Sequence, residues 1–190
     1  TVASVDLNIV GTKGGKTTVK NNGTNTLFLR MVLSGVPAAG KEVDSESNLG
    51  MTVQFLSMNG SVIDPTKIEQ GTDFLASITI YNPGVRGEYR EMALTQIFPS
   101  GWEIRNERME GGPSQLTNDH YDYQDIRDDR VYTYFYIPSQ KSRTYTLQLN
   151  ATYSGHFYLP AFYCEAMYDH TINARRAGQW VDVVPEQKAL

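Results

Sequence analysis

Strict alternation of apolar and polar residues is the feature of this sequence that most restricts its fold. It is clearest at residues 144–153, where the alternate positions are Tyr145, Leu147, Leu149, Ala151 and Tyr153. Because successive side chains of a strand point to opposite faces, a period of two places these residues on one side and the polar ones on the other. The stretch is therefore predicted to be a strand with one buried face.

The same pattern recurs along most of the chain. Strands are predicted at 51–58, 72–82, 92–98, 102–104 and 131–137. Turn signals separate them, such as Asn59-Gly60 and the Asn-Pro-Gly run at 82–84. The longest irregular stretch is expected at 109–129, and no helical period of useful length competes. Short strands with one polar face and frequent turns favour an all-β fold, an antiparallel β-sandwich of the immunoglobulin-like kind.

The N-terminal part is predicted to belong to a different domain. Short strands are expected at 5–10, 17–20 and 26–33, followed by a segment of small residues at 34–40 and a polar run at 41–48. Such a segment is the strongest linker signal in the chain. Residues 1–45 are therefore interpreted as strands of a preceding domain plus a linker, and residues 46–190 as the sandwich. The strand-like start without Met suggests a segment of something longer.

The stretch from Ser154 to Val184 makes the most specific statement about function. It is predicted to be strand, exposed loop, strand: one face carries Phe157, Leu159, Ala161 and Tyr163, and the pattern restarts at Val181 and Val183. The segment 165–177 interrupts the alternation and is expected to be a surface loop. This loop would expose large apolar and basic side chains, namely Met167, Tyr168, His170, Arg175 and Arg176.

Composition excludes several classes of function. The net charge is -4 and no basic stripe accompanies the aromatic residues, which argues against nucleic acid as a partner. No stretch has the apolar length of a membrane span, and the first residues carry no signal-peptide pattern. The one cysteine, Cys164, cannot form an internal disulfide, so the core alone must stabilise the fold.

The acidic segment 119–130 is a candidate calcium loop because carboxylates are the ligands that calcium prefers. Its acids recur about every third residue, however, without the glycine and terminal glutamate of an EF-hand. Arg127 and Arg130 supply counter-charges within the segment. A corner tied by Asp-Arg pairs is the favoured interpretation, and neither a metal nor another cofactor is expected.

Catalysis is the minority hypothesis. No Gly-x-Ser-x-Gly motif occurs, and His120, His156 and His170 have no catalytic pattern around them. Cys164 follows a strand residue and precedes Glu165, which favours an inert buried thiol over a nucleophile. A polysaccharide lyase could use Tyr, His and Arg in a groove, but the net negative charge would repel acidic sugars. The chain is therefore predicted not to be an enzyme.

Four segments resemble bacterial alpha-2-macroglobulins, in the order in which that family has them. They are the Ser-Gly-Val-Pro run at 34–37, the Phe-Pro-Ser-Gly-Trp-Glu-Ile run at 98–104 with Asn106 and Arg108, the Asp-Arg corner at 125–131, and Glu-Ala-Met-Tyr-Asp at 165–169. The chain departs from the family at His170 and Glu107, where proline is usual. The resemblance spans nearly the whole chain and identifies residues 46–190 as similar to the family's last macroglobulin-like domain.

The resemblance implies a non-catalytic piece of a large exported endopeptidase inhibitor of the periplasm or cell envelope, with a lipid anchor on the parent left open. In such inhibitors an attacking protease cleaves a bait region, and a Cys-Gln thioester then traps the protease. The Cys-x-Glu-Gln signature of that thioester is absent at Cys164. The implied partners are the other domains of the same chain, above all the thioester domain, and target proteases through the full-length parent.

The resemblance also implies a role for the loop. The family's last domain shields the thioester from water, and the matching residues here are Met167 and Tyr168, with Glu165 and Asp169 beside them as interdomain contacts. A large apolar pair suits this task, since Met adapts its shape and Tyr adds a polar tip. Two alternatives remain: Met167 and Tyr168 merely cap their own sandwich, or the chain is a freestanding Ig-like module that binds carbohydrate or protein at a cell surface.

Overall fold

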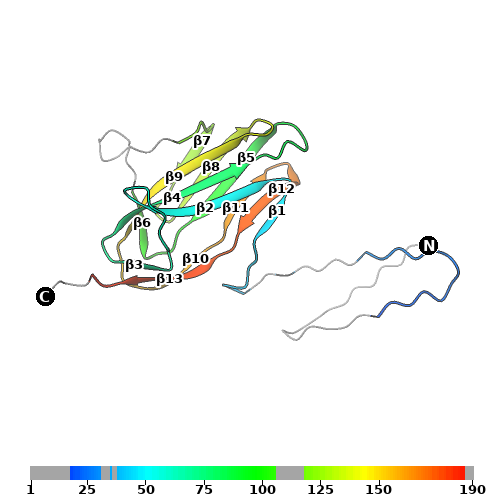
Figure 1. Cartoon of the computed structure of the whole chain (residues 1–190), viewed down its shortest axis with the longest axis horizontal. Helices are drawn as coiled ribbons and strands as arrows, with labels where there is room; N and C mark the ends of the chain where they lie inside the picture. The colour runs from blue at the N-terminus through cyan, green and yellow to red at the C-terminus, as the bar shows by residue number, and fades with distance from the viewer. Residues whose placement is uncertain (1–17, 31–34, 36–37, 106–117, 187–190) are drawn as a thin grey trace. The chain divides into compact units, whose positions relative to one another are not determined.

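The computed structural model describes residues 18–30, 35, 38–105 and 118–186. The chain divides into two units, Thr1–Val36 and Pro37–Leu190. The second unit is built of strands, and its described residues contain no helix (Figure 1). The strands are β1 (Ser45–Ser47), β2 (Gly50–Ser57), β3 (Lys67–Glu69), β4 (Asp73–Tyr81), β5 (Tyr89–Ile97), β6 (Trp102–Arg105), β7 (Tyr123–Ile126), β8 (Arg130–Ile137), β9 (Ser142–Ala151), β10 (Gly155–Leu159), β11 (Phe162–Ala166), β12 (Asp169–Arg176) and β13 (Gln179–Val184).

The described residues of the first unit, 18–30 and 35, form no strand. A turn follows residue 20, where Gly23 N donates to Asn21 Oδ1 and Asn21 Nδ2 donates to Asn25 O. The strands expected at 17–20 and 26–33 are not formed within the described residues, where Leu27, Phe28 and Leu29 are exposed. An alternating run needs a partner strand that satisfies its backbone and covers its apolar face. The strand expected at 5–10 lies outside the described residues.

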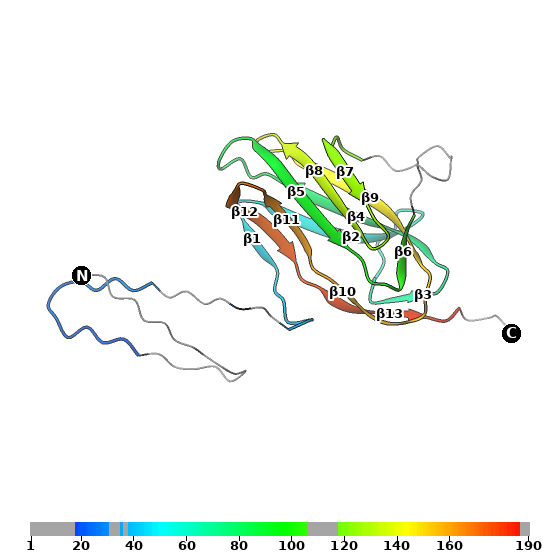
Figure 2. The ribbon, with the colours of Figure 1, turned by 180° about the vertical axis from the view of Figure 1, so that it is seen from behind.

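Two main sheets face one another. Strands β1-β12-β11-β5-β8-β7 form the larger sheet, β2-β4-β9-β6 form the second, and a third sheet, β10-β13-β3, extends from one end (Figures 1 and 2). Among the described residues, all strand pairs are antiparallel except β13 with β3, which run parallel. The predicted all-β sandwich is therefore confirmed, with one parallel pair that the sequence pattern does not indicate. No helix that could span a membrane occurs in the described part of the chain.

The core lies between the two main sheets and uses the faces that the alternation predicts. In β4 the four apolar positions 74, 76, 78 and 80 are fully buried, and in β8 so are 131, 133, 135 and 137. Aromatic rings join the sheets: Phe135 of β8 contacts Tyr145 of β9 with ring centroids 5.0 Å apart. Phe55 of β2 similarly contacts Phe162 of β11 at 6.3 Å. The period-two pattern thus identifies both the strands and their buried faces.

The predicted face of residues 155–163 is wrong in its second half. Two strands occupy this stretch, and the buried residues are Leu159 in β10 but Phe162 and Cys164 in β11, instead of Ala161 and Tyr163. The chain leaves the small sheet after β10 and enters the larger sheet at β11. The residues between them, Pro160 and Ala161, belong to neither strand, so the phase of the alternation shifts by one. Val181 and Val183 are buried as predicted.

The acidic stretch is less irregular than predicted. Strand β7 lies within it and pairs with β8, Tyr123 opposite Tyr134 and Ile126 opposite Val131. The backbone of this four-residue edge strand is satisfied by β8, although its own sequence is too short and too charged to show a buried face. The part of the prediction at 109–117 lies outside the described residues.

Residues 38–47 lie along the edge of the second unit. Gly40 N donates to the Tyr158 hydroxyl at 3.0 Å, Arg175 Nε to Val43 O at 3.1 Å, and Ala177 N to Asp44 Oδ1 at 2.7 Å. Strand β1 then pairs with β12. The domain division at residue 45 stays a prediction, but the described residues just before it are hydrogen-bonded to the sandwich.

Candidate interdomain contact site

Met167 and Tyr168 form the apex of a hairpin. Strands β11 and β12 pair antiparallel with Ala166 opposite Asp169, which leaves these two residues as the whole connection. The side chains are exposed, Met167 at 42% and Tyr168 at 82% of their full area. We call these two residues the apex turn. Two large side chains on so short a connection stand out from the sheet with little freedom to fold back.

The loop predicted at 165–177 is therefore wrong except for its apex. Strand β12 occupies most of it, and this strand lies inside the larger sheet, between β1 and β11. Its sequence shows little alternation, because only two of its eight residues face the core. Only Ile172 and Ala174 of this strand are buried, and basic or polar side chains fill the other positions.

Asp169 is held next to the apex turn by its own strand. Its Oδ1 accepts hydrogen bonds from Thr171 N at 3.0 Å and from Thr171 Oγ1 at 2.6 Å. These bonds, helped by the nearby Arg86 guanidinium, lower the pKa of the Asp169 carboxyl. Asp169 is thus a fixed negative charge at the base of the turn.

Glu165 lies one position before the last residue of β11, on the solvent face of the sheet. Its Oε2 accepts a hydrogen bond from the Tyr163 hydroxyl at 3.1 Å and lies 3.8 Å from His170 Nδ1. Burial raises the pKa of the Tyr163 hydroxyl, and the negative charge of Glu165 raises this pKa further. The structure therefore brings Met167, Tyr168 and Asp169 together at the tip and places Glu165 slightly behind them.

Arg86 is the residue of this site that the sequence does not reveal. It lies in the β4–β5 loop, which reaches the same end of the sandwich as the apex turn (Figures 1 and 2). Its Nη1 donates to Asp169 Oδ2 at 3.0 Å and to Thr171 Oγ1 at 2.8 Å. In the sequence it is one basic residue in a charged connection, 83 positions from its partner, so no local signal could have identified it.

Cys164 occupies the core of the larger sheet directly before the site. The side chain is fully buried, and this burial raises the pKa of the thiol. A thiol that stays protonated and inaccessible is a poor nucleophile. The position therefore agrees with the predicted inert role.

The histidines lie on separate elements. His156 on β10 pairs with Asp182 at 2.7 Å and stacks on Trp180, with ring centroids 4.7 Å apart. His120 packs against Tyr136, and His170 stands exposed near Glu165. This dispersal gives no support to the lyase hypothesis, which needs Tyr, His and Arg together in a groove.

The acidic segment is tied by Asp-Arg pairs as predicted. Arg127 Nε donates to Asp125 Oδ2 at 2.9 Å, and Arg130 Nη2 donates to Asp129 Oδ2 at 2.6 Å. Asp119 instead accepts the backbone N–H of Thr144 at 2.7 Å. Within the described ranges, no group of His, Cys, Asp and Glu side chains converges as metal ligands would.

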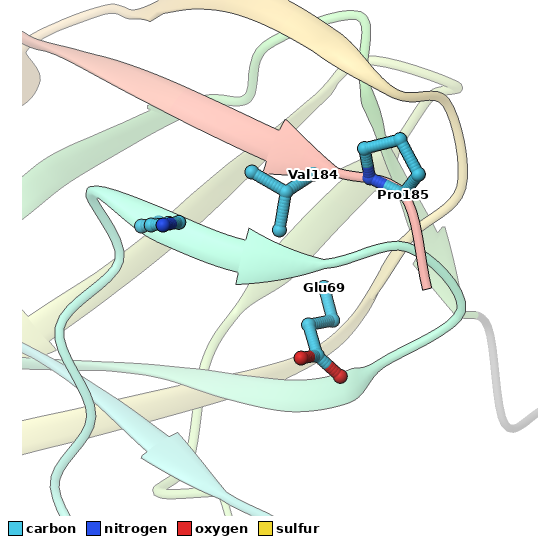
Figure 3. Close-up of a pocket in the computed structure, with 4 residues that line it drawn as sticks. Glu69, Val184 and Pro185 are labelled. Carbon is cyan, nitrogen blue, oxygen red and sulfur yellow. The ribbon is translucent and has the colours of Figure 1, made fainter. Parts of the chain in front are cut away.

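A hollow of about 460 Å³ lies on the third sheet, away from the strands that carry the apex turn. It is lined by Lys67 and Glu69 of β3 and by Val184 and Pro185 at the end of β13 (Figure 3). One cation and one carboxylate on a shallow surface offer no catalytic set. The apex turn therefore remains the strongest candidate site in the part of the chain that the structure describes.

Residues 49–170 match the family model described as "Bacterial Alpha-2-macroglobulin MG10 domain". The chain belongs to the bacterial alpha-2-macroglobulin MG10 family. The matched residues include both the β4–β5 loop and the apex turn, so Arg86, Met167, Tyr168 and Asp169 all lie within the MG10 match. The resemblance inferred from four short segments is thereby confirmed.

Two relatives with similar sequences are also alpha-2-macroglobulins. An alpha-2-macroglobulin of Rickettsia conorii is 28% identical over 153 residues, which is 77% of this chain and 8% of that relative. An alpha-2-macroglobulin homologue of Yersinia pestis is 39% identical over 67 residues, 35% of this chain and 3% of that protein. This MG10 chain thus spans less than a tenth of the length of these curated relatives.

Solved structures share the fold. Native Escherichia coli alpha-2-macroglobulin, from domain MG7 to the C-terminus, superposes with a TM-score of 0.68 at 17% identity, covering 80% of this chain and 25% of that one. Salmonella alpha-2-macroglobulin reacted with methylamine gives 0.66 at 20% identity, covering 78% of this chain and 10% of that one. At these identities the likeness concerns the MG10 fold alone.

Proposed function

We propose that this MG10 domain is the non-catalytic C-terminal domain of a bacterial alpha-2-macroglobulin that traps proteases, and that its apex turn packs against the thioester domain. The observation that carries the proposal is the exposure of Met167 and Tyr168 on a two-residue turn. Large apolar side chains exposed at the apex of a hairpin are suited to fill a hollow on a neighbouring surface.

The reactivity of a thioester explains why Met167 and Tyr168 would be useful at this contact. A thioester is an activated acyl group that water or an amine can attack, so it survives only where both are excluded. A Met side chain fills an irregular surface closely, and a Tyr ring adds a large flat area with a polar tip that can stay wet. The apex turn would thus act as a plug over the reactive bond.

A purely structural role for this chain in the trap is consistent with its one thiol. Cys164 is buried, its pKa is raised, and it lacks the thioester signature. In this proposal the reactive bond belongs to another domain of the same chain, and the inhibitor's protease targets interact with the full-length parent. The extracytoplasmic setting, periplasm or cell envelope, is part of the same proposal.

Site-specific photo-crosslinking in the full-length protein tests the contact. A benzoylphenylalanine at position 168 should form an intramolecular crosslink to the thioester domain, mapped by mass spectrometry. The matched control is the same probe at Tyr123, which is also an exposed tyrosine of the larger sheet but lies on the edge strand β7. Crosslinks from position 168 only to other MG10 residues would sink the proposal and support a simple cap.

A further inference from the structure

The apex turn is weakly held by its own hairpin. The register passes from Glu165 opposite Asn173 to Ala166 opposite Asp169, so three residues of β12 have no pairing position on β11. Met167 N donates to Glu91 O at 2.9 Å, which ties the turn to β5 at one point. An interrupted ladder makes the residues after the turn depend on other restraints. The backbone is held at Thr171 O, which accepts Ser47 Oγ at 2.7 Å and Asn48 Nδ2 at 3.0 Å, but these bonds do not reach Asp169 beside the turn.

Arg86 supplies such a restraint. A single nitrogen, Nη1, bonds Asp169 Oδ2 at 3.0 Å and Thr171 Oγ1 at 2.8 Å. The other carboxylate oxygen of Asp169 accepts the backbone N–H and the hydroxyl of Thr171. Arg86, Asp169 and Thr171, which we call the brace, therefore close a hydrogen-bonded ring across the irregular part of the hairpin. Charge-assisted bonds of this kind are directional, so they fix orientation as well as position.

The loop that carries Arg86 is itself anchored. Asn82 is fully buried, and its Nδ2 donates to Gly87 O at 2.8 Å, Ile137 O at 3.2 Å and Pro138 O at 3.3 Å. Its Oδ1 accepts Gly84 N at 2.8 Å. Gly84 and Gly87 have φ of 81° and 76°, which favours glycine at both positions. The brace thus connects the apex turn to a fixed point of the core.

The side chains of the brace are partly exposed to solvent. The side chains of Arg86 and Asp169 are 47% and 41% exposed. Ion pairs as exposed as this add little to the stability of a fold because water competes for both groups. Their effect is therefore expected on the geometry of the turn more than on the unfolding of the domain.

We propose that Arg86 is a positioning residue, which holds Met167 and Tyr168 in the orientation that the neighbouring domain receives. The consequence for the thioester rests on the proposed function, whereas the effect on the turn does not. Without Arg86 the turn would sample several orientations. Contact with the neighbouring domain would then carry the entropic cost of ordering the turn.

Backbone 15N order parameters of the 190-residue chain test the first part directly. Arg86→Met should lower the order parameters of Met167, Tyr168 and Thr171 from about 0.85 to below about 0.6, the range of flexible backbone. Arg86→Lys should keep most of the order, because one cationic nitrogen makes both bonds. The control is Arg90→Met, since the Arg90 guanidinium pairs with Glu88 on its own segment. Unchanged order in Arg86→Met would overturn the proposal.

The rate of methylamine uptake by the full-length protein tests the second part. Arg86→Met should raise the rate roughly threefold to tenfold, the scale of a modest loss of preorganisation, and should have no further effect in a background that carries both Met167→Ala and Tyr168→Ala. An additional increase in that background would mean that Arg86 contacts the partner itself and would overturn the positioning role. If Tyr168→Ala leaves the rate unchanged, the proposed function fails, while the order parameters still decide the role of Arg86.

Discussion

Gly178 lies directly against the hydroxyl of Tyr158. A Cβ at Gly178 would come within 2.2 Å of Tyr158 Oη and within 2.7 Å of the Leu159 carbonyl oxygen, distances that no side chain can adopt. The same hydroxyl donates to Glu42 Oε2 at 2.5 Å and accepts Gly40 N at 3.0 Å. Gly178 therefore makes room for the tyrosine that fastens the segment before β1 to the sandwich.

Gly178→Ala should displace Tyr158 and release that segment. We expect a loss of about 1–3 kcal/mol in the free energy of unfolding, the usual cost of forcing extra volume into a packed site. Trypsin should also cleave after the exposed Lys41 at a higher rate than in the wild type. Urea denaturation and limited proteolysis measure the two effects.

Gly50→Ala is the matched control for this substitution. A Cβ there would lie 3.6 Å from the nearest atom, an ordinary contact. Equal rates of cleavage after Lys41 in the two variants would show that Tyr158 does not fasten the segment.

Gln96→Met should stabilise the domain. Both polar atoms of the Gln96 side chain are buried and have no hydrogen-bond partner among the described residues. An unsatisfied buried amide costs about 1–3 kcal/mol, and Met has a similar shape without that cost. We expect a gain of about 1–2 kcal/mol in thermal or urea unfolding.

Gln124→Met is the comparison for that substitution, because Gln124 Nε2 donates to Thr133 Oγ1 at 3.0 Å. This variant should lose stability or be neutral. A decrease in the stability of Gln96→Met would indicate that ordered water or a partner satisfies Gln96 in solution.

The alternation of the sequence predicts the fold because the sandwich buries one face of each long strand. Residues 72–82 and 131–137 follow this rule, because alternate residues of β4 and β8 are buried in the core. The rule fails at Pro160 and Ala161, where the chain changes sheets, and at β7, a short edge strand stabilised by its neighbour. The local sequence pattern cannot reveal structural features that depend on contact with a second segment of the chain.

The candidate site was predictable only in part. The exposed positions of Met167 and Tyr168 agree with the sequence interpretation, although they lie on a hairpin instead of a long loop. The sequence does not predict strand β12, because only Ile172 and Ala174 of its eight residues are buried and the others are polar or charged. Arg86 could not be identified, since its bond to Asp169 connects segments that only the folded sheet brings together.

Cys164 should resist thiol reagents in the native protein. Its side chain is fully buried and its pKa is raised, so both access and thiolate formation require opening of the larger sheet. With Ellman's reagent near pH 8 we expect negligible reaction, and one thiol per chain after addition of denaturant. Rapid labelling of the native protein would contradict the inert role and reopen the question of a reactive cysteine.

Acid should weaken the attachment of β1 through Glu46. Its Oε1 accepts Met51 N at 3.1 Å and pairs with Arg176, and the bond to Met51 N is the main cause of its lowered pKa. Because the folded pKa lies below the ordinary value of 4.5, this stabilisation is complete above that pH and is lost as the pH falls through the folded pKa.

Glu46→Gln should therefore be less stable than the wild type at pH 7, with the difference shrinking below about pH 4. Urea denaturation at several pH values measures this. A difference that stays constant with pH would show that the Glu46 charge has no part in the attachment.

The most direct test of the account is the rate of methylamine incorporation into the full-length protein with Tyr168→Ala, compared with the wild type and with Tyr123→Ala. If the apex turn shields the thioester, Tyr168→Ala should react roughly tenfold faster, which corresponds to about 1.4 kcal/mol of lost protection. Tyr123→Ala should react at the wild-type rate. Equal rates in all three proteins would contradict the shield and leave Met167 and Tyr168 as a cap on their own sandwich.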